Sequence, residues 1–207
     1  MNATRSDDPE LVELGTLLAP AYRTLGQLYL DPPDERTVGA IAEWCTAVGD
    51  EQATFPEPLQ DAFENIEAGA KEDNSQLRGA FTELLQGVGY GASPAPPYES
   101  LYVDGVLNGP SSSEVEAFYL EAGVELAVDD ELIDHAGYEL AFLAELCERG
   151  AVEAQRGFIE THIGDWLTEF HGEAAAYDPP LFYQGVFELT GSLLEFHRET
   201  IQEGRQR

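Results

Sequence analysis

The sequence predicts an all-α protein, a single globular helical domain over residues 1–207 with about eight to ten helices. Apolar residues recur three or four positions apart in most segments, and this spacing places them on one face of a helix. Proline and glycine separate these segments, whereas the alternating pattern typical of strands is scarce. The chain has 207 residues, of which 43% are hydrophobic, and this is enough for one substantial core.

The first part of the chain is predicted to hold four helices. Asp8-Pro9 is typical of a helix start, and an apolar stripe over residues 11–29 continues until Asp31-Pro32-Pro33. Pro20 is expected to break or kink this helix, because proline removes a backbone donor. Apolar periodicity predicts further helices over residues 34–48, 56–70 and 76–85.

The second part begins with residues 87–97, whose Gly, Ala and Pro content predicts a surface loop of restricted geometry. A short helix is expected from Gly109-Pro110 to Gly123. The central helix is expected to be capped by Asp129 or Asp130 and to stop at Gly150. Two more helices are predicted over residues 151–170 and 178–203.

The charge balance is strongly acidic, with 40 Asp and Glu residues against 10 Lys and Arg and a net charge of −30. Nucleic acid is therefore not expected as a partner, since that affinity comes from Lys and Arg on phosphates. The acidic residues are spread over every segment, which indicates adaptation to a salty cytoplasm; a specific basic partner is the alternative. At about 1 M salt the Debye length falls to about 3 Å, so self-repulsion is screened.

No targeting or membrane segment is expected. The first ten residues are polar and acidic, without the basic and apolar regions of a signal peptide. No apolar run approaches the roughly 18 residues that span a bilayer, so we expect a cytoplasmic protein without stable membrane insertion. Cys45 and Cys147 are far apart and lack zinc-ligand spacing, so both are expected to be buried or inert thiols.

A candidate polar site lies where Asp134, His135 and Glu139 follow one another, because helical residues four apart share a face. With His162, the pair His135 and Glu139 suggests one alternative, a metal-dependent helical hydrolase. The spacing matches no established ligand set, and no phosphate loop or nucleophile elbow is present. We therefore expect no catalytic residue, metal or other cofactor. A structural hydrogen bond that orients His135 is the plainer interpretation.

The run Pro97-Tyr98-Glu99-Ser100-Leu101-Tyr102 carries two tyrosines beside the Pro-rich loop. These rings either anchor the loop on the core or form the wall of a peptide pocket, because tyrosine has a broad apolar face and a polar tip. This run, the Asp134-His135 pair with Glu139, and the series Phe158, His162 and Trp166 occur in an order that resembles the redox-enzyme maturation chaperones of the TorD/DmsD/NarJ type. The resemblance covers roughly residues 76–200.

The resemblance implies a TorD-like all-helical fold and a chaperone without catalytic activity. Its partner would be the catalytic subunit of a molybdopterin-containing oxidoreductase, held as the apo form or by its N-terminal twin-arginine leader until the cofactor is inserted. The peptide site that the resemblance implies consists of Pro97, Tyr98, Glu99, Tyr102, Asp134, His135 and Glu139. A general helical interaction module is a second alternative, and a homodimer is left open.

Overall fold

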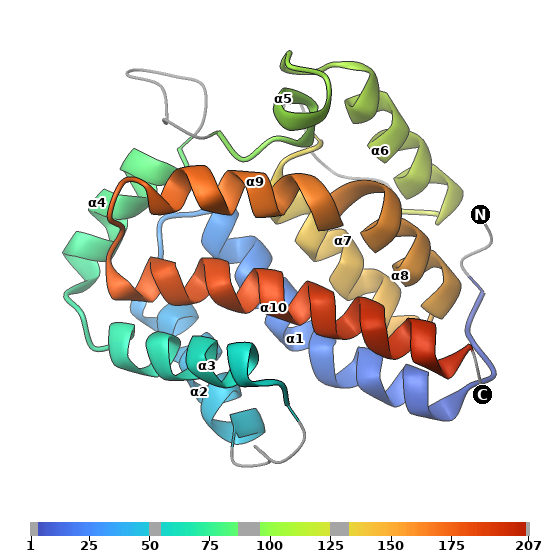
Figure 1. The fold of residues 1–207 in the computed structure, drawn as a ribbon, viewed down its shortest axis with the longest axis horizontal. Coiled ribbons are helices and arrows are strands. Elements are labelled where there is room, and N and C mark those ends of the chain that lie inside the picture. Colours follow the sequence, from blue (N-terminus) through green and yellow to red (C-terminus); the bar gives the residue numbers. More distant parts are fainter. Residues whose placement is uncertain (1–3, 50–54, 87–95, 125–132, 206–207) are drawn as a thin grey trace.

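The computed structural model describes residues 4–49, 55–86, 96–124 and 133–205, and these are almost entirely helical (Figure 1). The described part contains no named strand, so the all-α prediction is confirmed. None of its helices combines the length and apolar character needed to cross a membrane. In chain order the elements are α1 (Pro9–Leu30), α2 (Glu35–Gly49), α3 (Glu57–Gly69), α4 (Asn74–Leu84), α5 (Glu99–Val103), α6 (Pro110–Glu121), α7 (Ala136–Glu148), α8 (Val152–Phe158), the π-helical turn η2 (Ile159–Ile163), α9 (Gly164–Ala175) and α10 (Leu181–Gly204).

Helix α1 starts as predicted, with Asp8 accepting hydrogen bonds from the backbone N–H groups of Glu10 and Leu11. Of the break or kink expected at Pro20, the break is wrong, because α1 continues from Pro9 to Leu30, and the kink stays a prediction. Pro20 lies on the exposed side of the helix. Water can satisfy the carbonyl that loses its donor there, and the buried stripe on the opposite side holds the helix together.

Helices α1 and α7 pack closely because glycines meet at their contact. A Cβ atom on Gly26 would lie 2.8 Å from the carbonyl oxygen of Gly137, and one on Gly137 would lie 2.7 Å from that of Gly26. Contacts this short exclude any side chain. The two backbones therefore approach each other only because both residues are glycine.

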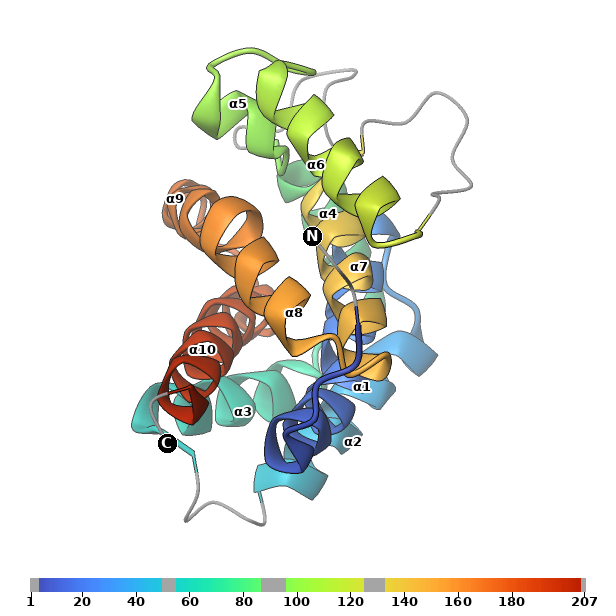
Figure 2. The same cartoon turned by 90° about the vertical axis from the view of Figure 1, so that its right-hand side faces the viewer.

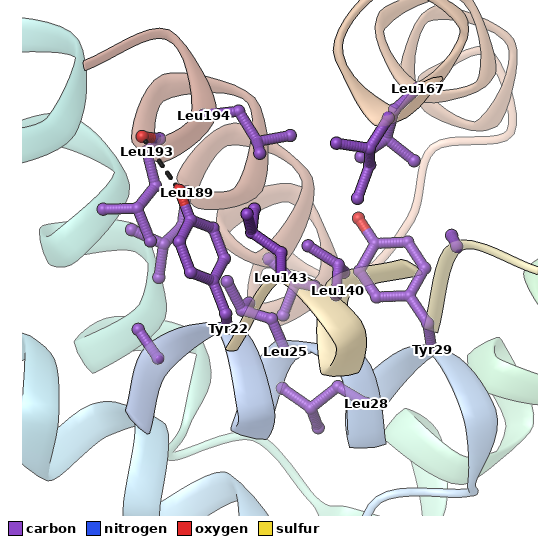
Figure 3. Packing of buried hydrophobic residues seen from close by; sticks show 14 of the residues in the cluster. Tyr22, Leu25, Leu28, Tyr29, Leu140, Leu143, Leu167, Leu189, Leu193 and Leu194 are labelled. Atoms are coloured by element: carbon purple, nitrogen blue, oxygen red, sulfur yellow. Dashed lines mark hydrogen bonds between the residues drawn. The ribbon is translucent and has the colours of Figure 1, made fainter. Parts of the chain in front are cut away.

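Two buried tyrosines of α1 reach across the core to α10 (Figure 3). The hydroxyl of Tyr22 donates to the carbonyl of Leu193 over 3.3 Å, and the hydroxyl of Tyr29 donates to Thr190 Oγ1 over 3.3 Å. Burial raises the pKa of both phenols, so they stay neutral donors. The aliphatic side chains around them form one continuous core cluster that joins α1, α7, η2, α9 and α10.

Helix α10 lies between α3 and α9, while α5 and α6 cover one end of the molecule beside α7 and α9 (Figures 1 and 2). Cys45 and Cys147 are free and buried, as expected. The single-domain organisation stays a prediction.

Two predicted helix boundaries are corrected. The central helix begins at Ala136, and its cap is His135; Asp129 and Asp130, the expected caps, lie outside the described residues. Its predicted end is confirmed, because Gly150 follows α7 with a φ of 65° that suits glycine. The predicted helix over 151–170 is three elements, α8, η2 and α9.

Candidate functional site

The Pro-rich segment before α5 is bound directly to the start of α7. Tyr98 and His135 form an isolated antiparallel bridge. The N–H of Glu99 donates to the carbonyl of Asp134, and the N–H of Ala136 donates to the carbonyl of Pro97, each over 2.9 Å. Two segments more than 30 residues apart in the sequence therefore run side by side, which places all seven predicted site residues in one region.

Asp134 is fully buried, and both of its carboxylate oxygens accept hydrogen bonds within the chain. Oδ2 accepts from the backbone N–H of Ser100 over 2.8 Å, and Oδ1 accepts from the hydroxyl of Ser112 over 3.0 Å. Ser100 lies in the first turn of α5 and Ser112 in the first turn of α6. The carboxylate thus satisfies an otherwise unpaired helix N–H and ties α5, α6 and the start of α7 together.

His135 is the N-cap of α7, so the prediction that it shares a helix face with Glu139 is wrong. Its ring nitrogen Nδ1 accepts from the backbone N–H of Gly137 over 3.0 Å, which assigns the ring proton to Nε2. The ring meets Tyr98 edge-on, with centroids 4.9 Å apart. Burial lowers the pKa of His135 to about 4, partly opposed by the charge of Asp134.

Glu139 and Glu99 form a buried pair of carboxyl groups between one tryptophan and one histidine. Oε2 of Glu139 accepts from the indole N–H of Trp166 over 3.2 Å, and Oε1 of Glu99 lies 3.1 Å from Nδ1 of His162. The other oxygens, Glu139 Oε1 and Glu99 Oε2, are buried without another polar partner among the described residues. The carboxyl groups of Glu139 and Glu99 are close enough that Glu99 contributes to raising the pKa of Glu139.

Burial, and then the neighbouring charge of Glu99, raise the pKa of Glu139 well above its usual value. Two carboxylates in an apolar setting are unfavourable when both are charged, and one retained proton removes that repulsion. Protonated Glu139 also gains an O–H that can donate to Glu99. Burial therefore favours the neutral form of Glu139.

Tyr98 and Tyr102 are partly exposed, whereas the other five predicted site residues are buried. The ring of Tyr102 stacks on Trp166 with centroids 5.7 Å apart and planes 28° apart. Its hydroxyl donates to Glu173 over 3.4 Å. Burial and the nearby charge of Glu173 raise the pKa of this phenol. The site thus presents a tyrosine face with an exposed carboxylate beside it.

The π-helical turn η2 contains His162, and Trp166 follows in the first turn of α9. The geometry of this turn sets the directions in which the two side chains meet Glu99 and Glu139. The N–H of Gly164 donates to the carbonyl of Ile159, five residues earlier, which widens the turn. A Cβ on Gly164 would lie 2.5 Å from that oxygen. Gly164 is therefore the residue in the sequence that could have indicated η2. The four-residue spacing of Phe158, His162 and Trp166 instead suggested one continuous α-helix.

The residues of the alternative hydrolase do not converge. His135 faces Tyr98, Glu139 bonds to Trp166, and His162 bonds to Glu99. Across the described ranges, no three His, Cys, Asp or Glu side chains gather in a way that could hold a metal ion. Sequence reasoning missed Ser100, Ser112 and Glu173, because only the folded chain brings them to the site.

The comparisons with known proteins agree with this arrangement. Residues 44–172 match the family described as the nitrate reductase delta subunit. The chain belongs to this family. The match includes all seven predicted site residues together with His162 and Trp166, so the resemblance to the TorD/NarJ type is confirmed.

Members of this family with assigned names are similar over part of this chain. Chaperone protein TorD of Shewanella loihica is 31% identical over 108 residues, 48% of this chain and 51% of the relative. The selenate reductase assembly chaperone protein of Thauera selenatis is 34% identical over 113 residues, 48% of this chain and 55% of the relative. The chain thus spans about half the length of the curated relatives it matches.

The fold extends the likeness over most of the chain. A crystal structure provisionally described as a redox enzyme maturation protein from Archaeoglobus fulgidus superimposes with a TM-score of 0.54. The overlap covers 89% of this chain and 94% of that chain, at 17% identity. At this identity the comparison supports a shared helical fold.

Proposed function

We propose that this protein is a non-catalytic cytoplasmic chaperone for a molybdopterin-containing oxidoreductase of the dimethyl sulfoxide, trimethylamine N-oxide or nitrate reductase type. It binds the apo catalytic subunit, or the twin-arginine leader of that subunit, before the cofactor is inserted and the enzyme is exported. Family membership carries the proposal, because the matched range includes all seven residues of the predicted peptide site. The names of the relatives from Shewanella loihica and Thauera selenatis support a role in enzyme assembly.

Two kinds of residue make up the proposed peptide site. Tyr98 and Tyr102 have exposed surface and contact the client. Pro97, Glu99, Asp134, His135 and Glu139 are buried, so they hold the two tyrosines in position. The buried residues are assigned this supporting role because the polar atoms of Asp134 and Nδ1 of His135 already have hydrogen-bond partners within the chain.

The chemistry of the exposed part suits an arginine side chain. A guanidinium group can stack on the face of Tyr102 while its N–H groups donate to Glu173, which lies beside that ring. Lysine has a compact charge and cannot make the same planar stack. In a salty cytoplasm, stacking and apolar contact persist when long-range attraction is screened.

Isothermal titration calorimetry in concentrated KCl tests the proposal with the leader of a candidate client, a Lys-Lys version and a scrambled version. The twin-arginine leader should bind most tightly. Tyr102→Leu, which keeps an apolar side chain on Trp166, should weaken binding by about tenfold. Tyr177→Leu is the matched control, because Tyr177 is exposed and lies outside the site.

The same titration with the apo catalytic subunit tests whether the protein binds the enzyme body instead of its leader. Binding of neither the leaders nor the apo subunit would refute the proposal. Equal affinity for the twin-arginine, Lys-Lys and scrambled leaders would show that the protein is a general interaction module instead.

A further inference from the structure

A large groove is lined by residues of α3, α9 and α10, on the side of α9 away from the peptide site. Its volume is about 770 Å³, which is within the usual range of ligand pockets. We propose that this groove is a second binding site, which takes a helical segment with large aliphatic side chains on one face and arginine or lysine beside them. This inference rests on the proposed function in one respect: the helical segment that binds the groove is part of the client enzyme.

The floor of the groove is apolar and rigid. Phe187 stacks on His171 with ring centroids 5.1 Å apart, and Nε2 of His171 lies 2.6 Å from the hydroxyl of Tyr29. Leu59 of α3 and Phe196 of α10 line the same space. Because these side chains are fixed by the core, the groove is formed before any partner arrives, which lowers the entropy cost of binding.

Two helical glycines keep the groove open. A Cβ atom on Gly172 would meet nothing within 4 Å, and one on Gly191 would meet only Nδ1 of His171 at 3.8 Å. Neither glycine is required by packing, unlike Gly26, although glycine inside a helix costs about 1 kcal/mol relative to alanine. Their small size leaves room for aliphatic side chains of a docked helix.

The rim of the groove is acidic, and this determines the chemistry of the partner. Glu188, Glu195 and Glu199 are exposed on α10 at intervals of seven and four residues, so they follow one edge. Asp178 also lines the groove, and the lining includes no lysine or arginine; the one basic neighbour of the rim among the described ion pairs is Arg198, which pairs with Glu195 over 2.6 Å. An apolar floor with an anionic rim complements a helix that is aliphatic on one face and cationic at its borders.

This groove is separate from the peptide site because the two use opposite faces of α9. Trp166, Phe170 and Glu173 contact Tyr102. Thr168, His171, Gly172 and Ala175 line the groove. The offset of two residues between these sets corresponds to a rotation of about 200° around the helix. A variant of one surface therefore leaves the other intact.

Fluorescence anisotropy tests the groove with a labelled synthetic helix of about 15 residues, leucine on one face and arginine elsewhere, in concentrated KCl. Gly172→Leu fills the groove and should raise the Kd of this peptide about tenfold or more. Gly79→Leu is the matched control, because Gly79 is an exposed glycine of α4 whose added Cβ also meets nothing within 4 Å. Gly79→Leu should bind as the wild type does, and equal affinity of the two variants would overturn the proposal.

A charge-matched pair tests the rim separately from the general acidity of the chain. Replacing Glu188, Glu195 and Glu199 by Gln should weaken binding about threefold, with a smaller effect as KCl rises. The control replaces three exposed glutamates elsewhere, Glu83, Glu114 and Glu116, and changes the net charge equally. An equal loss in both triple variants, or equal binding of a peptide with glutamate in place of arginine, would contradict a specific cationic partner.

The two proposals fail in distinguishable ways. If Gly172→Leu leaves the synthetic helix unaffected while the wild type still binds its client, the groove inference is wrong and the chaperone function stands. If the wild type binds the synthetic helix in a Gly172-dependent manner but neither leader nor apo subunit, the groove stands and the chaperone function is wrong. Tyr102→Leu should leave binding of the synthetic helix unchanged.

Discussion

Asp134 Oδ2 accepts a 2.8 Å hydrogen bond from the backbone N–H of Ser100, which is 34 residues earlier in the chain. The same carboxylate accepts from Ser112 through its other oxygen. One buried side chain thus replaces the water that would satisfy the start of α5 and orients the segment that carries Tyr98 and Tyr102. The proposed peptide-binding surface depends on this contact even though Asp134 is hidden from solvent.

Asp134→Ala should destabilise the fold by about 3 kcal/mol, because it leaves a buried N–H and a buried hydroxyl without acceptors. Urea unfolding measures the change. Asp73→Ala is the control: Asp73 caps α4 at the surface, so its loss should cost about 1 kcal/mol. Equal losses in the two variants would show that the buried carboxylate adds nothing beyond an ordinary cap.

His135 should make the fold sensitive to acid. Its pKa is lowered to about 4 by burial, whereas in the unfolded chain it is about 6.5, so the unfolded state binds a proton first as pH falls. The stabilisation is complete above about pH 6.5 and is lost as pH falls towards 4, by about 3 kcal/mol in all.

His135→Asn keeps a good helix cap without a titrating ring, so its stability should depend less on pH between about 6.5 and 4. Unfolding free energies of the wild type and the variant, measured at several pH values, give the difference. His171 and His197, whose pKa values are also lowered by burial, contribute equally to both proteins. Parallel curves would refute the assignment.

Glu139 should have the opposite dependence. Its pKa is raised by burial and by Glu99, so folding retains a proton that the unfolded chain releases above about pH 4.5. This stability is fully present below about pH 4.5 and falls as pH rises towards the folded pKa. In Glu139→Gln the amide can donate to Glu99 and accept from Trp166 without ionising.

Thermal unfolding at several pH values compares the wild type with Glu139→Gln. The two should be similar near pH 4.5, and the variant should be more stable at pH 8. Glu173→Gln is a control, because Glu173 is an exposed carboxylate on the face of α9 that carries Trp166. Its effect on stability should not change with pH in this way. A difference in stability between the wild type and Glu139→Gln that stays the same at every pH would show that the pKa of Glu139 is not raised in the fold.

Gly26→Ala should destabilise the α1–α7 contact by about 2 to 3 kcal/mol, because the new methyl group would lie 2.8 Å from a carbonyl oxygen. Gly39→Ala is the matched control: it also lies inside a helix, but its Cβ would meet nothing within 4 Å. That change should stabilise the protein by about 0.5 to 1 kcal/mol. Denaturant midpoints of the two variants should therefore move in opposite directions.

The net charge of −30 predicts that folding depends on salt. We expect the melting temperature to rise by about 10 °C between dilute buffer and concentrated KCl, because screening reduces self-repulsion. Sucrose at the same water activity is the control, since it favours burial without screening charge. An unchanged melting temperature in KCl would contradict adaptation to salt.

The all-α class, most helix positions and the grouping of Pro97–Glu139 into one site could be predicted from the sequence. The spacing of apolar residues and the positions of Pro and Gly are local signals, so they predict helices and helix ends without knowledge of the tertiary structure. The end of α7 at Gly150 shows this, because glycine adopts the φ of 65° found there without the steric cost that other residues incur. Order along the chain was also enough to indicate the family.

Only the tertiary structure decided which site residues are buried. Asp134, Glu99 and Glu139 look like surface carboxylates in a chain with 40 acidic residues, yet each is at most 2% exposed. Their partners, among them Ser100, Ser112 and Trp166, come from other helices, so no local pattern reveals them. The groove beside α10 is likewise absent from the sequence pattern, because its floor is built from three helices that meet only when the core forms.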